Sequence, residues 1–394
     1  MRGRARPGLI RDFNESKPVT YVELFFDLVY VFTIFRLSQT LLTRLNWVGL
    51  FETAVLLLTV WWVWAYTNLL TDTLDARLIR LQLLVIFTAF GSLLLATAIP
   101  EAFEQRGLLF AIAYLAINLG RSVVLAIALR RHIVGLRPRR AALWFLISGV
   151  PWLVGAEVDG TPRLVLWGIA ILIDYLTAEV GWPAPRIGRT APNEWNLASE
   201  HFAERYRQFV IVALGQTIAS TGAAFHASDF TLHQGSAFTV SFLITVLLYW
   251  IYFHRTREKL GPTFSGAREP SIRAREAGFA HLLMVAGVVG ITVSDELVIR
   301  GAAHRVGAYG AAVSLGGAVL FILGHALLGR HVFIDVATPR LIGAGVLLLA
   351  SPLLVGLPML AVSGAVAVVL AGIVIWDLLR TGEDLGEQTV THRL

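Results

Sequence analysis

Long apolar runs recur along the chain, and short polar segments separate them. Each run can cross a hydrocarbon core of about 30 Å as a helix that rises about 1.5 Å per residue. The pattern therefore predicts an all-α integral membrane protein with about twelve transmembrane helices. We expect these helices near 20–42, 49–70, 78–99, 107–130, 140–156, 163–182, 204–226, 236–254, 276–299, 307–328, 340–355 and 358–380.

Composition supports a membrane protein. The chain has 394 residues, of which 56% are hydrophobic and only 15% are charged, whereas a soluble domain carries about 25% charged residues. The chain has no cysteine, which excludes disulfides, thiol catalysis and thiolate metal sites. The formal net charge is +6, and the Arg residues that produce it cluster in short loops between the apolar runs. Membrane topology accounts for it without a nucleic-acid partner.

The distribution of basic residues predicts the topology. If the N-terminus is cytoplasmic, most of the 33 Lys and Arg fall on the cytoplasmic side, as the positive-inside rule requires. We therefore expect a multi-pass protein of the cell membrane with both termini in the cytoplasm. The first apolar run is long enough to span, so we expect no signal cleavage.

The two halves of the chain resemble each other, which predicts an internal repeat. Glu23 aligns with Glu204, and Arg121 aligns with His325 within short matching segments. Six spans per repeat would give both halves the same orientation, related by an axis along the membrane normal. The expected parts are an Arg-rich cytoplasmic segment 1–18, a first six-helix repeat 19–182, a cytoplasmic linker 183–199, a second six-helix repeat 200–380 and a cytoplasmic tail 381–394.

Glu23 and Asp27 are the most unusual residues in the first predicted span. They lie four residues apart on one face of a helix, and an ionisable side chain at membrane depth costs at least ~2.5 kcal/mol. We expect them to face the protein interior, where the lead helices of the two repeats meet. The hypothesis is an ion or substrate path formed by Glu23, Asp27, Glu204, His201 and Gln208. The alternative is that these groups lie at the cytoplasmic interface, hydrated or paired with Arg205 and Arg207, and only orient the entry of the helices.

Two further groups of polar residues fall within or beside predicted spans. Arg121, Asn118, Asp174 and His325 are expected to be buried for structural reasons, with Arg121 and Asp174 neutralising each other. The alternative is that Arg121 or His325 lines a substrate path. Glu101, Asp295 and Glu296 end predicted spans on the outer side. They either form a cation-attracting mouth or are solvated helix ends.

Enzymatic signatures are missing from the sequence. It contains no zinc-protease helix motif, nucleophile elbow, P-loop or dinucleotide fingerprint. We therefore expect no enzyme activity, cofactor or metal.

Several short segments carry a resemblance to a known family. They are ELFFDLVYVF at 23–32, AIPEAF at 98–103, HFAER at 201–205, LGQT at 214–217 and HLLMVAG at 281–287. Over roughly 18–380 the chain resembles the bacterial low temperature requirement protein A family. The resemblance implies a multi-span membrane protein and carries over no catalytic residues. A looser similarity, at Phe26-Asp27, is to lysosomal-type potassium channels of two six-span repeats, which implies a pore.

The sequence as a whole favours a transporter or channel for a small ion or solute, with proton coupling through the buried carboxylates as one form. A membrane sensor or accessory scaffold in a cold-stress response is the alternative, and a membrane-embedded enzyme is the third. The expected partners are the lipid bilayer and a small ion or solute. The oligomeric state and the identity of the solute are left open.

Overall fold

The computed structural model describes residues 18–131, 135–190, 199–256, 270–332 and 337–391, and these residues are helical apart from the connections between helices. The helices are α1 Tyr21–Thr43, α2 Trp47–Thr73, α3 Ile79–Ala98, η1 Ile99–Glu101, α4 Gly107–Ala128, α5 Leu136–Ala156, α6 Thr161–Glu179, α7 Ser199–His226, α8 Leu232–Thr256, α10 Pro270–Arg300, α11 Ala308–Val332, α12 Ala337–Leu354 and α13 Met359–Thr391. The all-α fold predicted from the apolar runs is confirmed.

Each predicted span coincides with a helix. Within the described residues, 11 helices are long and apolar enough to cross a membrane. α5 is not among them, and it begins with three arginines within its first five residues. α7 begins at Ser199 instead of 204, and α13 continues to Thr391 beyond the predicted end at 380. The predicted segment 1–18 lies outside the described residues except for its last residue.

Local capping explains where the first two helices begin. The carboxylate of Glu23 accepts hydrogen bonds from the backbone N–H and the hydroxyl of Thr20, both at 2.8 Å. Thr20 and Glu23 form a capping box, which satisfies donors that the first turn leaves unpaired. At the start of α2, Asn46 Oδ1 accepts from the N–H of Gly49 at 2.9 Å. Glu23 is therefore fixed at the entry of α1 by the local sequence.

Contacts between Cα atoms divide the chain into two compact units. Unit 1 contains residues 1–212 and 261–275, and unit 2 contains residues 213–260 and 276–394. The boundary falls inside α7, so the first half of this helix belongs with α1 and α2. The predicted six-plus-six repeat is not tested by this division and stays a prediction.

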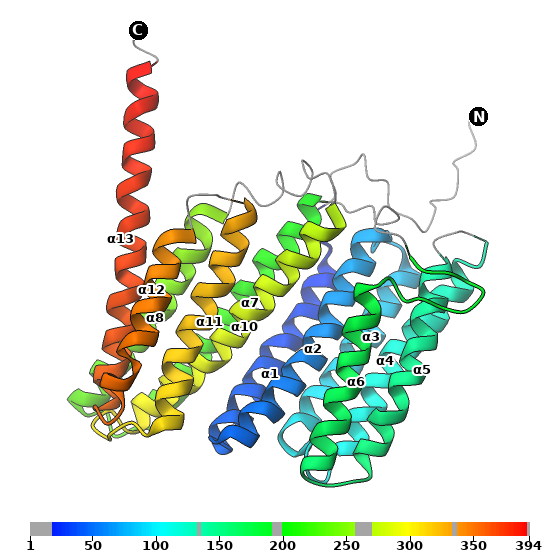
Figure 1. Ribbon diagram of the computed structural model, residues 1–394, viewed down its shortest axis with the longest axis horizontal. Coiled ribbons are helices and arrows are strands. Elements are labelled where there is room, and N and C mark those ends of the chain that lie inside the picture. The colour runs from blue at the N-terminus through cyan, green and yellow to red at the C-terminus, as the bar shows by residue number, and fades with distance from the viewer. Residues whose placement is uncertain (1–17, 132–134, 191–198, 257–269, 333–336, 392–394) are drawn as a thin grey trace. The chain divides into compact units, whose positions relative to one another are not determined.

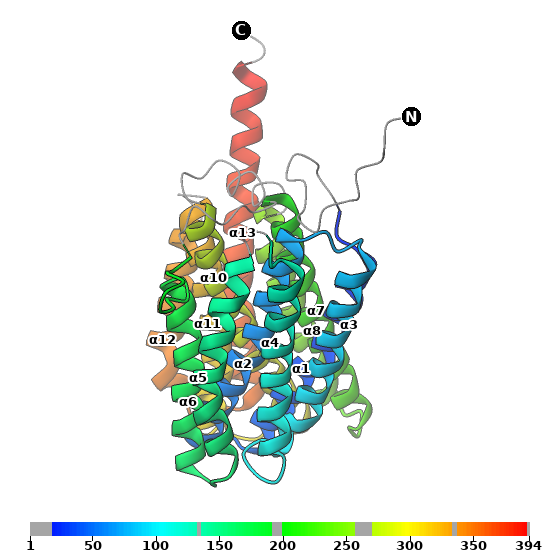
Figure 2. The ribbon, with the colours of Figure 1, turned by 90° about the vertical axis from the view of Figure 1, so that its right-hand side faces the viewer.

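Unit 1 is a bundle in which α1 packs on α2 and α3, and α3 to α6 pack as successive neighbours. Its helices run roughly parallel or antiparallel in both views (Figures 1 and 2). Aromatic side chains fill the space between α2 and the start of α7: the rings of Trp64 and Phe209 have centroids 4.2 Å apart, and those of Trp64 and Tyr206 5.2 Å. This packing places one face of α7 against α2.

Unit 2 depends on close helix contacts through glycine. A Cβ atom on Gly287 of α10 would lie 2.6 Å from the carbonyl oxygen of Gly317 and 2.6 Å from the backbone nitrogen of Phe321, both in α11. Small residues let membrane helices approach closely, and at this contact an added Cβ would already force the two helices apart. α11 also packs on α12, and α13 packs on α8 and α12.

Large apolar side chains remain exposed on the outside of many helices, such as Phe90, Ile127 and Leu172 in unit 1 and Leu349 and Val368 in unit 2. Exposed apolar surface of this extent is typical of contact with lipid. The protein is therefore a multi-pass membrane protein.

Candidate functional site

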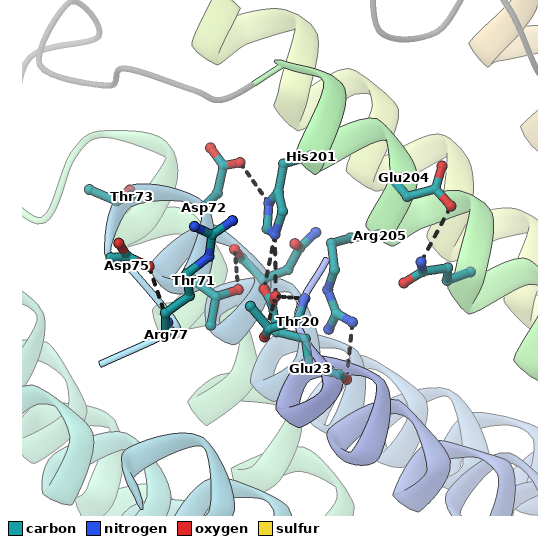
Figure 3. A network of polar contacts seen from close by, with 12 residues as sticks. Thr20, Glu23, Thr71, Asp72, Thr73, Asp75, Arg77, His201, Glu204 and Arg205 are labelled. Carbon is teal, nitrogen blue, oxygen red and sulfur yellow. Dashed lines mark hydrogen bonds and ion pairs between the residues drawn. The ribbon is translucent and has the colours of Figure 1, made fainter. Parts of the chain in front are cut away.

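The first carboxylate pair lies inside unit 1. Glu23 and Asp27, one turn apart on α1, are 0% and 1% exposed. Because an isolated buried carboxylate is very costly, each must be stabilised by partners from other helices. The partners come from α2 and from the first turns of α7 (Figure 3).

Asp27 is held by two donor side chains. Arg205 Nη1 and Nη2 donate to its two carboxylate oxygens at 2.5 and 2.8 Å, and Trp64 Nε1 donates at 2.9 Å. Arg205 is 0% exposed, and its Nη1 also donates to the backbone oxygen of Glu23 at 3.1 Å. A bidentate guanidinium–carboxylate pair is the strongest hydrogen-bonded geometry available to these groups.

His201 bridges the other two carboxylates. Its Nε2 lies 3.1 Å from Glu23 Oε1, and its Nδ1 lies 3.1 Å from Asp72 Oδ1. Neutral imidazole has one N–H donor, so it can donate to one carboxylate only, whereas imidazolium donates to both. Either His201 is charged, or one of the two carboxyl groups holds the proton. The arrangement can therefore hold a proton that three groups share.

We use the name acidic cluster for Glu23, Asp27, Asp72, His201 and Arg205. Three carboxylates stand against one guanidinium and one imidazole. Even with His201 charged, the acidic groups outnumber the basic ones among these five side chains. Across the described ranges, no three or more His, Cys, Asp or Glu side chains are placed to hold a metal ion.

Asn68 adds a polar group to the same stripe of α2. It lies one turn from Trp64, which contacts the acidic cluster, and one turn from Asp72, which belongs to it. Asn68 is fully buried, and neither atom of its amide has a hydrogen-bond partner among the described residues. Leaving a buried polar group unpaired costs about 1–3 kcal/mol. A water molecule, an ion or a polar part of a substrate would satisfy this amide.

Glu204 and Gln208 are not brought into the acidic cluster. The Glu204 side chain is 43% exposed and accepts from Arg207 Nε at 2.9 Å and from Gln208 at 3.3 Å; Figure 3 shows it directed away from His201. The predicted stripe through Glu204 and Gln208 was therefore wrong about which face of α7 meets α1. That face carries His201 and Arg205, which lie four residues apart.

Three residues of this site are missing from the predicted ion or substrate path. Asp72 lies just beyond the predicted span 49–70, and Arg205, at the start of the predicted span 204–226, was expected only as a pairing partner in the interface alternative. Asn68 and Asp72 do continue the stripe of Trp64 at intervals of four residues, and this periodicity is the signal that could have found them.

Arg121 and Asp174 do not neutralise each other as expected. Arg121 donates to Thr67 Oγ1 and Asn118 Oδ1, each at 2.7 Å, and its guanidinium lies 4.1 Å from the centre of the Tyr66 ring. Asp174 accepts from Tyr114 OH at 2.7 Å. A planar guanidinium can share its charge with amide and aromatic groups, so Arg121 is stabilised without a carboxylate pair.

The remaining predicted residues are not members of the acidic cluster. Glu101 in unit 1 is partly exposed and pairs with Arg106 at 2.9 Å. In unit 2, His325 is buried with its ring 6.3 Å from that of Tyr252. Asp295 and Glu296 are 0% and 3% exposed, so the expectation of solvated helix ends is wrong for both.

Comparison with known proteins identifies the family. The uncharacterized protein RA0937 of Rhizobium meliloti (strain 1021) is 30% identical over 376 residues, which cover 94% of this chain and 91% of that protein. No solved structure matches. The family described as bacterial low temperature requirement A protein (LtrA) matches residues 18–375. The chain therefore belongs to the bacterial low temperature requirement A protein family.

Proposed function

We propose that the protein moves a small ion or solute across the bilayer and that this movement is coupled to a proton held by the acidic cluster. The observation that carries the proposal is the position of His201, buried with one ring nitrogen 3.1 Å from Glu23 and the other 3.1 Å from Asp72. Imidazole is the side chain that most readily gains and loses a proton near neutral pH. Intramembrane ionisable groups of this kind mark proton relays and ion pathways.

The position of the acidic cluster along its helices supports proton exchange. Glu23 lies in the first turn of α1, Asp72 in the last turn of α2, and His201 in the first turn of α7. These three groups are thus near the ends of their helices, and a proton would have a short path to one membrane surface. Both termini of the chain are proposed to lie on the cytoplasmic side, which would make that surface the cytoplasmic one.

Arg205 links the proton site to the rest of unit 1. It lies one turn beyond His201 and donates both to Asp27 and to the backbone of Glu23. Protonation of Glu23 or Asp72 would change the field that acts on this guanidinium. The proposed coupling step is an exchange in which Arg205 loosens its hold on Asp27 when the His201 proton moves. The unpaired amide of Asn68 beside these groups is the proposed contact for the transported ion or solute.

The test uses the full-length protein in liposomes that contain a pH-sensitive dye. Gradients of K⁺, Na⁺ and H⁺ are imposed in turn, and the change in internal pH is recorded. We expect a proton flux above that of empty liposomes. This proton flux should fall at least tenfold in Asp72→Asn and in His201→Gln, and it should be unchanged in Glu204→Gln. Glu204 is the matched control because it lies on the same helix outside the acidic cluster.

Size-exclusion profiles of the variants separate loss of activity from loss of folding. If folded Asp72→Asn and His201→Gln both keep the flux and its pH dependence, the site is rejected. If no gradient produces a flux above empty liposomes, the transport proposal itself fails for these ions.

A further inference from the structure

Unit 2 contains a second buried polar group, which lies apart from the acidic cluster in the sequence and involves no residue of it. We use the name hydroxyl site for Asp295 of α10, Thr221 of α7 and Ser241 of α8. All three side chains are buried, and Asp295 and Ser241 are 0% exposed. The sequence alone placed Asp295 at an outer helix end, either in a cation-attracting mouth or in solvent, so this burial needs an explanation.

A ladder of neutral polar side chains leads along α7 and α10 to the hydroxyl site. The hydroxyls of Thr217 and Thr292 are 2.9 Å apart, Gln216 donates to Ser220 at 2.9 Å, and Thr292 lies within 3.4 Å of Gln216 Oε1. These four side chains are also buried. Oxygen atoms dominate the ladder, and it contains no basic group.

Asp295 lacks a cationic partner in the part of the chain that the structure describes. Its Oδ2 accepts one long hydrogen bond from Thr221, at 3.4 Å, while its Oδ1 has no partner. The hydroxyl of Ser241 lies close enough to this carboxylate to act on it as a hydrogen-bond donor, but it makes no hydrogen bond of normal geometry among the described residues. The charged side chain that acts on Asp295 is that of Glu296, which is also acidic. Glu296 itself pairs with Arg300 at 2.9 Å. An ionised carboxylate in this setting needs a positive charge, because its burial is otherwise very costly.

We propose that the hydroxyl site binds a monovalent alkali cation, with Na⁺ as the first candidate. Carboxylate and hydroxyl oxygens are the ligands that hard cations prefer. One carboxylate and neutral oxygens match a single positive charge, whereas Ca²⁺ sites draw on several carboxylates. The unpaired Oδ1 of Asp295 and the unpaired Oγ of Ser241 come from two different helices and supply two of the oxygen ligands. The proposal does not depend on the proton step assigned to His201.

The test is direct binding of radioactive ²²Na⁺ to the purified full-length protein in detergent, together with thermal unfolding in NaCl and in choline chloride at the same pH and ionic strength. We expect saturable ²²Na⁺ binding and a higher melting temperature in NaCl. Asp295→Asn should abolish both effects. Thr221→Val and Ser241→Ala should each weaken Na⁺ binding roughly tenfold, as expected for a lost polar contact to a charged group.

Thr245→Val is the matched control. Its hydroxyl lies one turn from Ser241 on α8 but donates to the backbone oxygen of Ser241, so Na⁺ affinity should stay within twofold of that of the wild type. The proposal is overturned if the wild-type protein shows no saturable ²²Na⁺ binding, or if its melting temperature depends on pH and not on Na⁺. Either result would mean that Asp295 is protonated. Retained Na⁺ binding in folded Asp295→Asn would do the same. Because Thr221→Val and Ser241→Ala keep the carboxylate, they test the site even if Asp295→Asn does not fold.

Discussion

Arg205 and Asp27 form a bidentate ion pair across 178 residues of sequence, with nitrogen–oxygen distances of 2.5 and 2.8 Å and both side chains buried. This pair joins the beginning of α7 to the beginning of α1 inside unit 1. Trp64 completes the surroundings of the carboxylate by donating from α2. Three helices are thus joined by one carboxylate.

Replacing Arg205 with Met is expected to destabilise the protein by about 3–5 kcal/mol, because removing one partner leaves a buried charge uncompensated. The double variant Asp27→Asn with Arg205→Met is expected to cost less than the sum of the two single changes, since both charges are gone. Denaturant unfolding in detergent measures the three variants. Glu204→Gln serves as the control and should change stability by less than about 0.5 kcal/mol. Strictly additive effects would contradict a direct interaction.

Replacing Asn68 with Leu is expected to leave the melting temperature unchanged or raise it, because the buried amide has no hydrogen-bond partner among the described residues. Transport in liposomes should nevertheless be lost if Asn68 contacts the solute. The matched control is Asn118→Leu. Asn118 accepts from Arg121 and donates to the backbone oxygen of Tyr114, so its loss should cost about 1–3 kcal/mol. An Asn68→Leu variant as unstable as Asn118→Leu would show that its amide has a structural partner.

The glycine contact between α10 and α11 gives a prediction about stability alone. Gly287→Ala should destabilise by about 1–3 kcal/mol, because its Cβ would lie 2.6 Å from backbone atoms of Gly317 and Phe321. Gly316→Ala, on the same helix as Gly317, has no neighbouring atom within 4 Å of the added Cβ and should be neutral or stabilising by up to about 1 kcal/mol. Equal effects of the two changes would argue against the close helix contact.

The predicted topology can be tested by labelling, since the chain has no cysteine. Asp229→Cys, in the exposed connection between α7 and α8, should react with a membrane-impermeant maleimide in intact cells. Arg189→Cys, exposed in the connection after α6, should react only after the membrane is opened. The reverse labelling pattern would show that the orientation is inverted. The helix ends that carry the acidic cluster would then lie at the outer membrane surface.

The sequence determined the helices and the family. Apolar length is a local property, because a segment of about 20 apolar residues must form a helix to satisfy its backbone groups within lipid. For this reason every predicted span is a helix in the structure. Glu23 and Asp27 could also be singled out in advance, since the cost of a carboxylate at membrane depth does not depend on its partners.

The tertiary structure alone decided which groups meet. In the sequence, Asp72 looked like a residue just beyond a helix end, and Arg205 looked like a residue of the membrane interface. Glu204 looked equivalent to Glu23, and Arg121 looked like the partner of Asp174. The choice of partner depends on the rotation of each helix about its axis, and a span with apolar side chains on all faces gives little information about that rotation. Only packing of α7 against α1 and α2 turned His201 and Arg205 inward and Glu204 outward. Only the packing around α10 buried Asp295 among hydroxyls.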